Sequence, residues 1–479
     1  MQKFNRQALL TFTQTITCNS LLLVLLVLLA AGCRSQQPQS TGNGISLNEK
    51  SAVQYLHAQL ETAHPTNPPL VFYKQEVKPG NLSQQQAQVW NYWLEANKER
   101  LAKYWSTLPE SGLQDSSIWE LPTQKEMLFA RIKKGQKPAT GYPMFINLHG
   151  GGTLPTATWK WGAAFNDSEW AAAKKLGAMY KDEPSLYFVP RMADDRRGRW
   201  YHRGEQTAFI RAWQLAVLAG DADPDRIHVV GISEGGYGSF RMGLFFADYF
   251  AGIGPMAGIA ALSEAPIENI RNTAFYASVG EFDHAYGRSV GGQQWKLALD
   301  SAAKNNNGQF PHIVDIQKGR GHGIDYFKTT AWLRNFSRKP YPDTVSFQYY
   351  AVHDTVFNRV NDSSYTYRNS FAYCRLDGLQ HTAVKQSDGL LETAVRDFYW
   401  EKSGNTYRIQ SKNRVGEVQG DFTLYLSEID FTKPVQVWYN GKVVYQQKVK
   451  LNVGTMLESM ALFGDPKRIF AAKLTFKIT

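Results

Sequence analysis

The sequence predicts an α/β fold in which helices cover both faces of a mostly parallel sheet. From about residue 125 to residue 337, short apolar runs bounded by turn residues alternate with amphipathic segments. Strands that alternate with helices in this way are typical of parallel sheets, and the working residues of such sheets sit on loops at the carboxyl ends of the strands. The expected strands are 142–148, 185–190, 226–230, 272–280 and 312–319, and the expected helices include 168–181 and 204–220.

The regions on either side of this alternation have a different character. Segments 46–63 and 82–105 repeat apolar residues at helical spacing, which predicts a helical N-terminal extension over 46–118. The α/β domain is then expected at 119–340. A chain of 479 residues is long enough for two or three such units.

Residues 341–479 are predicted to form a β-rich C-terminal domain. Their β-branched and aromatic runs are separated by few helical intervals. Asn440-Gly441, flanked by alternating apolar residues, is a strong hairpin signal. A single helix is expected at 452–464.

The N-terminus has the pattern of a secretion signal. Lys3 and Arg6 precede an apolar run at 21–30, and small residues lead to Cys33. This ending resembles a bacterial lipobox, so we expect a lipoprotein signal peptide at 1–33 and a polar tether at 34–45. The resemblance implies a protein of the bacterial cell envelope, outside the cytoplasm and anchored to a membrane through lipidated Cys33. Ordinary cleavage and an uncleaved anchor are the alternatives.

The bulk composition excludes several classes of protein. The chain is 43% hydrophobic and 20% charged, as in globular proteins, and its net charge of +11 is spread along the sequence. No nucleic-acid motif, no metal-ligand spacing and no phosphate-binding loop is evident. We therefore expect no nucleic-acid partner, no metal and no cofactor.

Ser233 is the candidate nucleophile. It lies in a G-x-S-x-G motif, directly after the apolar run at 226–230 and before a segment with helical spacing. A strand, a tight turn and a helix would expose the serine hydroxyl at the edge of the sheet.

The HGGG run at 149–152 follows another expected strand, and its glycines let backbone N–H groups approach an oxyanion. Gly151, Gly152 and the N–H of Glu234 are the expected oxyanion hole.

An acid and a base follow the serine in the order that such sites require. Asp283 comes just after the expected strand 272–280, and His322 just after 312–319, so both fall on the same edge as Ser233. We predict that His322 accepts the Ser233 proton and that Asp283 orients His322. His284 is the alternative base, and the alternative acids are Glu281 and Asp325.

These residues resemble the α/β-hydrolase superfamily, and most closely its secreted esterases of the polyhydroxybutyrate-depolymerase and feruloyl-esterase kinds. The resemblance covers about 140–337 and rests on NLHGGG, DPDRIHVVGISEGG, VGEFD and KGRGHG. It implies a doubly wound sheet and a serine hydrolase that cleaves carboxylic esters, with an ester or an acylated saccharide or peptide as substrate. The superfamily branch borders on prolyl-oligopeptidase-type peptidases, so a peptidase with the same triad is an alternative. A non-catalytic, glycan-binding surface lipoprotein is the other.

Two features near the expected site are unusual. Glu234 stands where a small or apolar residue is common in the family, and its charge would oppose an oxyanion unless the side chain is paired elsewhere. The loop at 190–204 follows the expected strand 185–190 and is rich in arginine and aromatic residues. We predict that Arg196, Arg199 and Trp200 bind substrate, with a solvated charged loop as the alternative.

Overall fold

The computed structural model describes most of the chain after residue 46. The predicted signal peptide, the tether and Cys33 lie outside the described residues, and the domain limits near 118 and 340 also stay predictions. Asn48–Thr479 forms one compact unit. Among the described residues, no helix is both long and apolar enough to cross a membrane. The described residues are 47–62, 64–106, 117–121, 126–196, 199–200, 202–262, 266–306, 308–351, 368–382, 384–385, 391–392 and 394–478.

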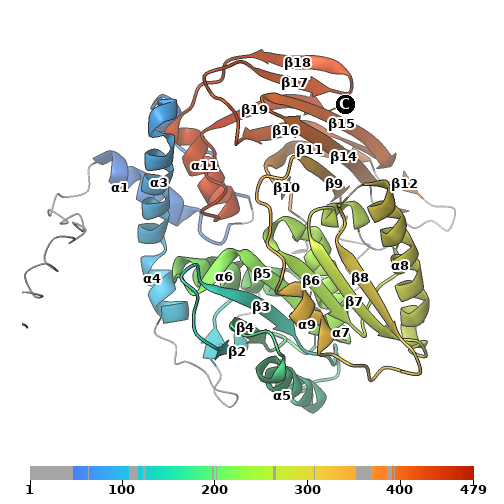
Figure 1. The fold of residues 1–479 in the computed structure, drawn as a ribbon. Helices are drawn as coiled ribbons and strands as arrows, with labels where there is room; N and C mark the ends of the chain where they lie inside the picture. The colour runs from blue at the N-terminus through green and yellow to red at the C-terminus, as the bar shows by residue number, and fades with distance from the viewer. Residues whose placement is uncertain are drawn as a thin grey trace, which may run out of the picture. The chain divides into compact units, whose positions relative to one another are not determined.

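An eight-stranded sheet occupies the α/β part of this unit (Figure 1). Its order is β1-β2-β4-β3-β5-β6-β7-β8. The strands from β4 to β8 in that order run parallel, and β2 and β1 add an antiparallel edge. This arrangement confirms the α/β class with a large, mostly parallel sheet. The strands are β1 (Ser117–Trp119), β2 (Met127–Lys134), β3 (Tyr142–Leu148), β4 (Ser185–Pro190), β5 (Ala222–Ile232), β6 (Gly252–Met256), β7 (Ala274–Gly280) and β8 (His312–Gln317).

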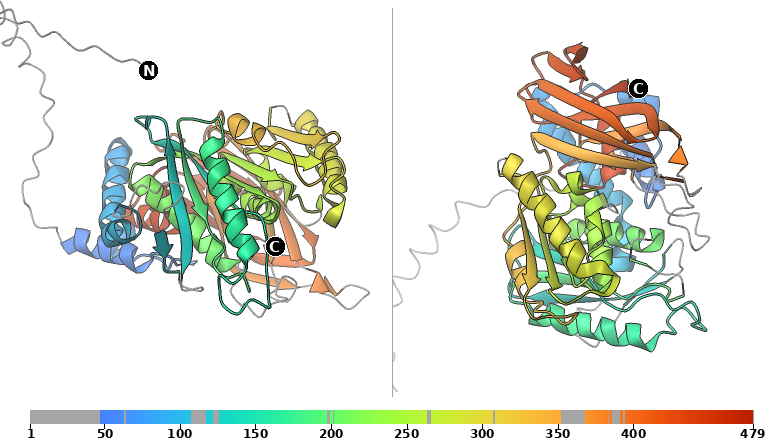
Figure 2. Two further views of the ribbon diagram at one scale, coloured as in Figure 1. Left: turned by 90° about the horizontal axis from the view of Figure 1, so that it is seen from below. Right: turned by 90° about the vertical axis from the view of Figure 1, so that its right-hand side faces the viewer.

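Helices cover both faces of the sheet, as predicted (Figure 2). Side chains of β3 alternate between two cores: Met144 and Ile146 belong to the first, and Phe145 to the second. Helices α6, α7 and α8 supply apolar residues to the first core, while α5 and α9 supply the second. The helices are α5 (Ala164–Met179), α6 (Arg203–Leu218), α7 (Glu234–Phe245), α8 (Arg288–Asn305) and α9 (Lys328–Leu333).

The N-terminal region is helical, but the expected helix over 82–105 is interrupted. The side chain of Asn97 donates a hydrogen bond to the Trp93 carbonyl oxygen at 2.8 Å, at the point where the first helix ends. Of the apolar residues at helical spacing within 82–105, Val89, Trp93 and Trp105 are buried. The elements are α1 (Leu47–Ala58), α2 (Leu70–Tyr73), η1 (Pro79–Asn81), α3 (Leu82–Ala96), α4 (Lys98–Leu101) and the π-helical turn η2 (Ala102–Ser106).

Two further sheets form the β-rich C-terminal region, which Figure 1 shows in orange and red. Aromatic side chains join them: Phe398 lies 5.3 Å from Phe422 between ring centroids, and Phe347 stacks on Phe371 at 4.8 Å. The five-stranded sheet contains β18 (Lys442–Gln447), β17 (Val435–Tyr439), β15 (Thr406–Val415), β14 (Ala394–Ser403) and β9 (Thr344–Ala351). The four-stranded sheet contains β10 (Ser370–Phe371), β11 (Cys374–Thr382), β16 (Glu417–Leu426) and β19 (Ala472–Ile478).

The predicted hairpin and the predicted C-terminal helix are both present. Asn440 and Gly441 have φ of 46° and 81° between β17 and β18, as a tight hairpin turn requires. Helix α11 (Val453–Phe463) begins after Asn452, whose side chain accepts the N–H of Thr455. A pair of short strands, β12 (Val384–Lys385) and β13 (Leu391–Glu392), completes the region.

Buried ion pairs attach the C-terminal region to the α/β part. Asp248, which follows α7, accepts hydrogen bonds from Arg368 at 2.8 Å and from Arg468 at 2.5 Å. Asp465 accepts one from Arg338 and another from Arg468, each at 2.7 Å. A buried charge is costly unless it is paired, so these contacts require the two regions to pack in one arrangement.

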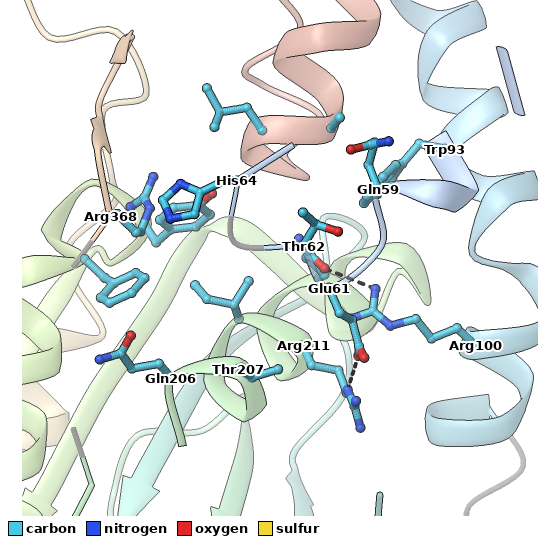
Figure 3. A pocket seen from close by; sticks show the side chains of 16 residues that line it. Gln59, Glu61, Thr62, His64, Trp93, Arg100, Gln206, Thr207, Arg211 and Arg368 are labelled. Atoms are coloured by element: carbon cyan, nitrogen blue, oxygen red, sulfur yellow. Dashed lines mark hydrogen bonds and ion pairs between the residues drawn. The ribbon is translucent and has the colours of Figure 1, made fainter. Parts of the chain in front are cut away.

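A small cavity of about 130 Å³ lies where the N-terminal helices meet α6 and α11 (Figure 3). Glu61 projects between two arginines: its Oε1 is 2.5 Å from Arg211 Nε and 3.2 Å from Arg100 Nη2. The side chains of both arginines are at least nine-tenths buried. Glu61 therefore neutralises cations that have little access to water.

We predict that Glu61→Gln lowers the free energy of unfolding by about 2 kcal/mol, because it leaves two buried guanidinium groups without their carboxylate. Urea unfolding measures the change. Glu95→Gln is the matched control: Glu95 pairs with Lys98 on the surface, and its loss is expected to cost less than about 0.5 kcal/mol. Equal effects of the two substitutions would contradict the prediction.

Candidate functional site

Ser233 occupies a sharp turn between β5 and α7. Its φ is 56° and its ψ is −113°, a conformation that non-glycine residues rarely adopt. The turn is hydrogen-bonded to the neighbouring strand, because the Ser233 N–H donates to the Met256 carbonyl oxygen of β6 at 2.9 Å. A Cβ at 231 would overlap the backbone of Gly235, and a Cβ at 235 would overlap the backbone of Leu148. The two motif glycines are thus required by the close approach of three backbone segments.

The structure brings the three predicted triad residues together. The Ser233 Oγ lies 3.0 Å from His322 Nε2, and His322 Nδ1 lies 2.7 Å from Asp283 Oδ2. Asp283 follows β7 and His322 follows β8, so both reach Ser233 from the carboxyl edge of the sheet. The carboxylate accepts the Nδ1 proton, which leaves Nε2 free to accept the proton of the serine hydroxyl. This is the geometry of a nucleophile, a base and an orienting acid.

The alternative acids and the alternative base form other hydrogen bonds. Glu281 accepts the N–H of Gly319, and Asp325 accepts the N–H of Phe327. His284 is exposed, and its Nδ1 lies 3.1 Å from the hydroxyl of Ser289. His322 and Asp283 are therefore the pair that the geometry favours.

Arg288 is a part of the site that the sequence analysis missed. Its Nη1 donates to Asp283 Oδ1 at 2.9 Å, and its Nε donates to the Tyr237 hydroxyl at 3.1 Å. Asp283 thus has one oxygen on His322 and the other on a buried guanidinium. The position of Arg288, five residues after Asp283 and at the start of a helix, was the one signal in the sequence that could have indicated its role.

The HGGG loop after β3 is held by buried polar groups. Met192 N–H donates to His149 Nε2 at 3.0 Å, so the proton of His149 sits on Nδ1, which donates to the Gly150 carbonyl oxygen at 2.6 Å. Burial lowers the pKa of His149 to about 3, and the nearby charge of Arg191 acts in the same direction. His149 therefore stays neutral and supports the loop.

The predicted oxyanion hole needs one correction. The Gly152 N–H donates to Asn166 Oδ1 at 2.9 Å, and the Asn166 amide donates back to the Gly152 carbonyl oxygen at 2.8 Å. Gly152 is thus held by a buried side chain, and its N–H is already used in a hydrogen bond within the protein. Gly151 and Glu234 line the pocket beside Ser233. The Glu234 amide is the first of α7 and has no helical acceptor, so these two N–H groups remain the candidates.

The carboxylate of Glu234 is paired away from the nucleophile. Its Oε2 lies 2.7 Å from Arg199 Nη1, and the side chain is buried. Burial raises the pKa of Glu234, while Arg199, Arg241 and Arg288 act against that rise. The charge expected to oppose an oxyanion is therefore offset by neighbouring guanidinium groups.

The three predicted substrate-binding residues lie in three different environments. Arg199 lines the pocket of about 730 Å³ that contains Ser233. Arg196 is exposed and forms two hydrogen bonds with Asp194, at 2.9 and 2.8 Å, and it does not line this pocket. Trp200 is wholly buried, and its Nε1 donates to the His149 carbonyl oxygen at 3.0 Å. The prediction was wrong for Trp200, because its side chain turns into the core, while substrate binding by Arg196 stays a prediction.

Sequence comparisons assign no family to this chain: no family model and no curated protein matches it. Its structure is similar to a thermostable esterase, with 18% identity over 47% of this chain and a TM-score of 0.33. The match spans 63% of that esterase, less than two thirds of its length. A ferulic acid esterase matches with 16% identity, 46% of this chain, 97% of the other and a TM-score of 0.34. Esterase 2 of Thermogutta terrifontis, phosphorylated by paraoxon, matches with 11% identity, 48% of this chain, 94% of the other and a TM-score of 0.35.

Acid should destabilise the fold through its buried histidines. Burial lowers the pKa of His149 and of His228 to about 3, from an ordinary value of 6.5. The unfolded chain therefore binds more protons between pH 6.5 and pH 3, so the stabilisation is complete above 6.5 and is lost as the pH falls. Each histidine is expected to remove about 2 kcal/mol between pH 7 and pH 5.

His149→Gln tests this, because glutamine keeps a donor and an acceptor but does not titrate. Urea unfolding at pH 7, 6 and 5 should show a loss smaller by about 2 kcal/mol than in the unmodified chain. An unchanged pH dependence would show that His149 is not held neutral by the fold.

Proposed function

We propose that this chain is a serine hydrolase that cleaves carboxylic esters through an acyl-serine intermediate. One observation carries the proposal: Ser233, His322 and Asp283 are joined by two hydrogen bonds, of 3.0 and 2.7 Å, on the carboxyl edge of the sheet. Metal-independent acyl transfer needs a hydroxyl, a base and an orienting acid in this order.

In the first half of the reaction, Ser233 Oγ attacks the ester carbonyl carbon while His322 Nε2 takes the hydroxyl proton. Asp283 stabilises the imidazolium that forms and keeps its ring oriented. The N–H groups of Gly151 and Glu234 are the proposed donors to the oxyanion. Loss of one such donor typically costs about 3–4 kcal/mol of transition-state stabilisation.

Collapse of the tetrahedral intermediate breaks the ester C–O bond, and His322 gives its proton to the departing alkoxide. Water then attacks the acyl-serine with His322 again as the base, which releases the carboxylic acid and restores Ser233. An amide would pass through the same steps with an amine as leaving group.

Ser233→Ala is expected to abolish both labelling by a fluorophosphonate probe and hydrolysis of p-nitrophenyl acetate, with kcat reduced about 10⁴-fold or more. Ser168→Ala, a change of an exposed serine on α5, is the control and should retain both. Release of nitroaniline from aminoacyl nitroanilides, measured in parallel, distinguishes a peptidase. Failure of the unmodified chain to react with the probe would favour a binding protein without catalysis.

We also propose that the chain is exported and anchored in the bacterial envelope by a lipid on Cys33. The basic start, the apolar run and the small residues before Cys33 support this. When the full chain is made in a bacterial host fed an alkyne fatty acid, the chain should incorporate the label and Cys33→Ser should not. Cys374→Ser is the control, because Cys374 is a buried thiol that should have no part in lipidation. Label retained in Cys33→Ser would refute the anchor.

A further inference from the structure

Arg288 links the acid of the triad to the helix that follows the nucleophile. It is the first residue of α8, and its side chain is buried. Its Nη1 donates to Asp283 Oδ1 at 2.9 Å, and its Nε donates to the Tyr237 hydroxyl of α7 at 3.1 Å. We propose that Arg288 is a positioning residue, which holds the Asp283 carboxylate so that its second oxygen faces His322. This inference rests on the proposed ester hydrolysis and assigns a role in it to a residue outside the triad.

The Asp283 carboxylate is buried, and each of its oxygens accepts a hydrogen bond from a different partner. Oδ1 accepts from Arg288 at 2.9 Å, and Oδ2 accepts from His322 Nδ1 at 2.7 Å. The last torsion of an aspartate side chain has a broad range, so a bond to one oxygen alone leaves the carboxylate free to turn. A bond to each oxygen fixes its plane. The orientation of His322 therefore depends on the contact that Arg288 makes with the other oxygen of the carboxylate.

Arg288 acts on His322 through this carboxylate and not by a hydrogen bond of its own. Arg288 Nη1 lies 3.3 Å from His322 Nδ1. The Nδ1 proton is donated to Asp283, and a guanidinium group has donors but no acceptor. The two nitrogens therefore cannot bond to each other, and both direct a proton at the carboxylate of Asp283.

Helix α8 holds Arg288 close to the strand from which Asp283 comes. A Cβ at 292 would overlap the Val279 side chain of β7, so the helix and the strand are in tight contact. The loop between them is closed, because the Ser289 N–H donates to the Asp283 carbonyl oxygen at 3.0 Å. The acid and its guanidinium partner are thus fixed relative to each other by the backbone as well as by their ion pair.

Tyr237 extends this support to the nucleophile. Its N–H donates to the Ser233 carbonyl oxygen at 3.1 Å, and its hydroxyl accepts the hydrogen bond from Arg288 Nε. One guanidinium group thus joins the helix after the nucleophile to the loop that carries the acid. A displacement of about 1 Å between reacting groups can cost about 10²-fold in rate. We expect the loss of Arg288 to lower kcat by about this factor.

The first test is hydrolysis of p-nitrophenyl acetate, with Ser233→Ala as the background rate. Arg288→Gln should lower kcat about 10²-fold and change KM less than about threefold, because its effect is on the triad and not on binding. Arg288→Lys keeps a cation that can pair with Asp283, so it should recover about tenfold of this loss. Arg271→Gln is the matched control. Arg271 is a buried arginine that precedes β7 and bonds to Ser346, and its substitution should leave kcat within about twofold.

A cycle of double substitutions tests whether Arg288 acts through Asp283. In the Asp283→Asn background, Arg288→Gln should lower kcat no further, because the carboxylate that it positions is gone. Tyr237→Phe removes only the hydroxyl that accepts the Nε bond. It should lower kcat several-fold in the unmodified chain, but not when combined with Arg288→Gln. Circular dichroism and urea unfolding show whether each variant is folded.

The outcomes separate this inference from the proposed function. A kcat of Arg288→Gln within about threefold of the unmodified chain, with hydrolysis that depends on Ser233, would overturn the positioning role and leave the esterase. An equal loss from Arg288→Gln with and without Asp283 would also overturn it, because the effect would not pass through the acid. If Arg288→Gln does not fold, an unchanged kcat in both Arg288→Lys and Tyr237→Phe would overturn it. Neither hydrolysis nor fluorophosphonate labelling in the unmodified chain would refute the proposed function itself.

Discussion

The turn at Ser233 depends on three backbone segments lying closer together than side chains allow. The strained serine is bonded to the end of β6 through its N–H, and the helix that follows rests on the end of β3. Glycine at 235 permits the approach to β3, and glycine at 236 permits the approach to the Met256 carbonyl oxygen of β6. The position of the nucleophile is therefore a property of three adjacent strands, and the rigid sheet offsets the cost of its backbone conformation.

Several buried polar groups near this turn form one connected set of hydrogen bonds. Asn166 holds Gly152 by two hydrogen bonds and donates a third to Asp195, and Asp195 in turn is paired with Arg191 at 2.6 Å. Burial raises the pKa of Asp195, but the hydrogen bonds from Arg191 and Asn166 outweigh it and the net shift is downward. The polar side chains of the loop after β4 thus serve mainly to position the loop after β3.

Ion pairs join separate elements both in the interior and at the pocket. Between the α/β part and the C-terminal sheets, Asp248 and Asp465 share the buried Arg468, so the charges are mutually compensated. At the pocket, Arg199 is paired with Glu234 and Arg288 with Asp283, so ion pairs also join separate elements beside the nucleophile. Such pairs hold one packing in place, because separating them would leave a buried charge without a partner.

The sequence by itself determined the alternation of strands and helices, the order of the serine, acid and histidine, and the hairpin at Asn440-Gly441. These are local patterns, because a strand's period, a turn's demand for glycine and a motif's spacing are set within a few residues. Strand β6 was missed because glycine and proline in GIGPM conceal its apolar pattern; its pairing with β5 and β7 makes it a strand. Only the tertiary structure decided that Trp200 is buried and that Asn166 accepts the hydrogen bond of the Gly152 N–H. It also decided that Arg241 and Arg288 reach the pocket of Ser233. The physical reason is that each of these depends on a side chain from another element, whose distance in space has no counterpart in its distance along the chain.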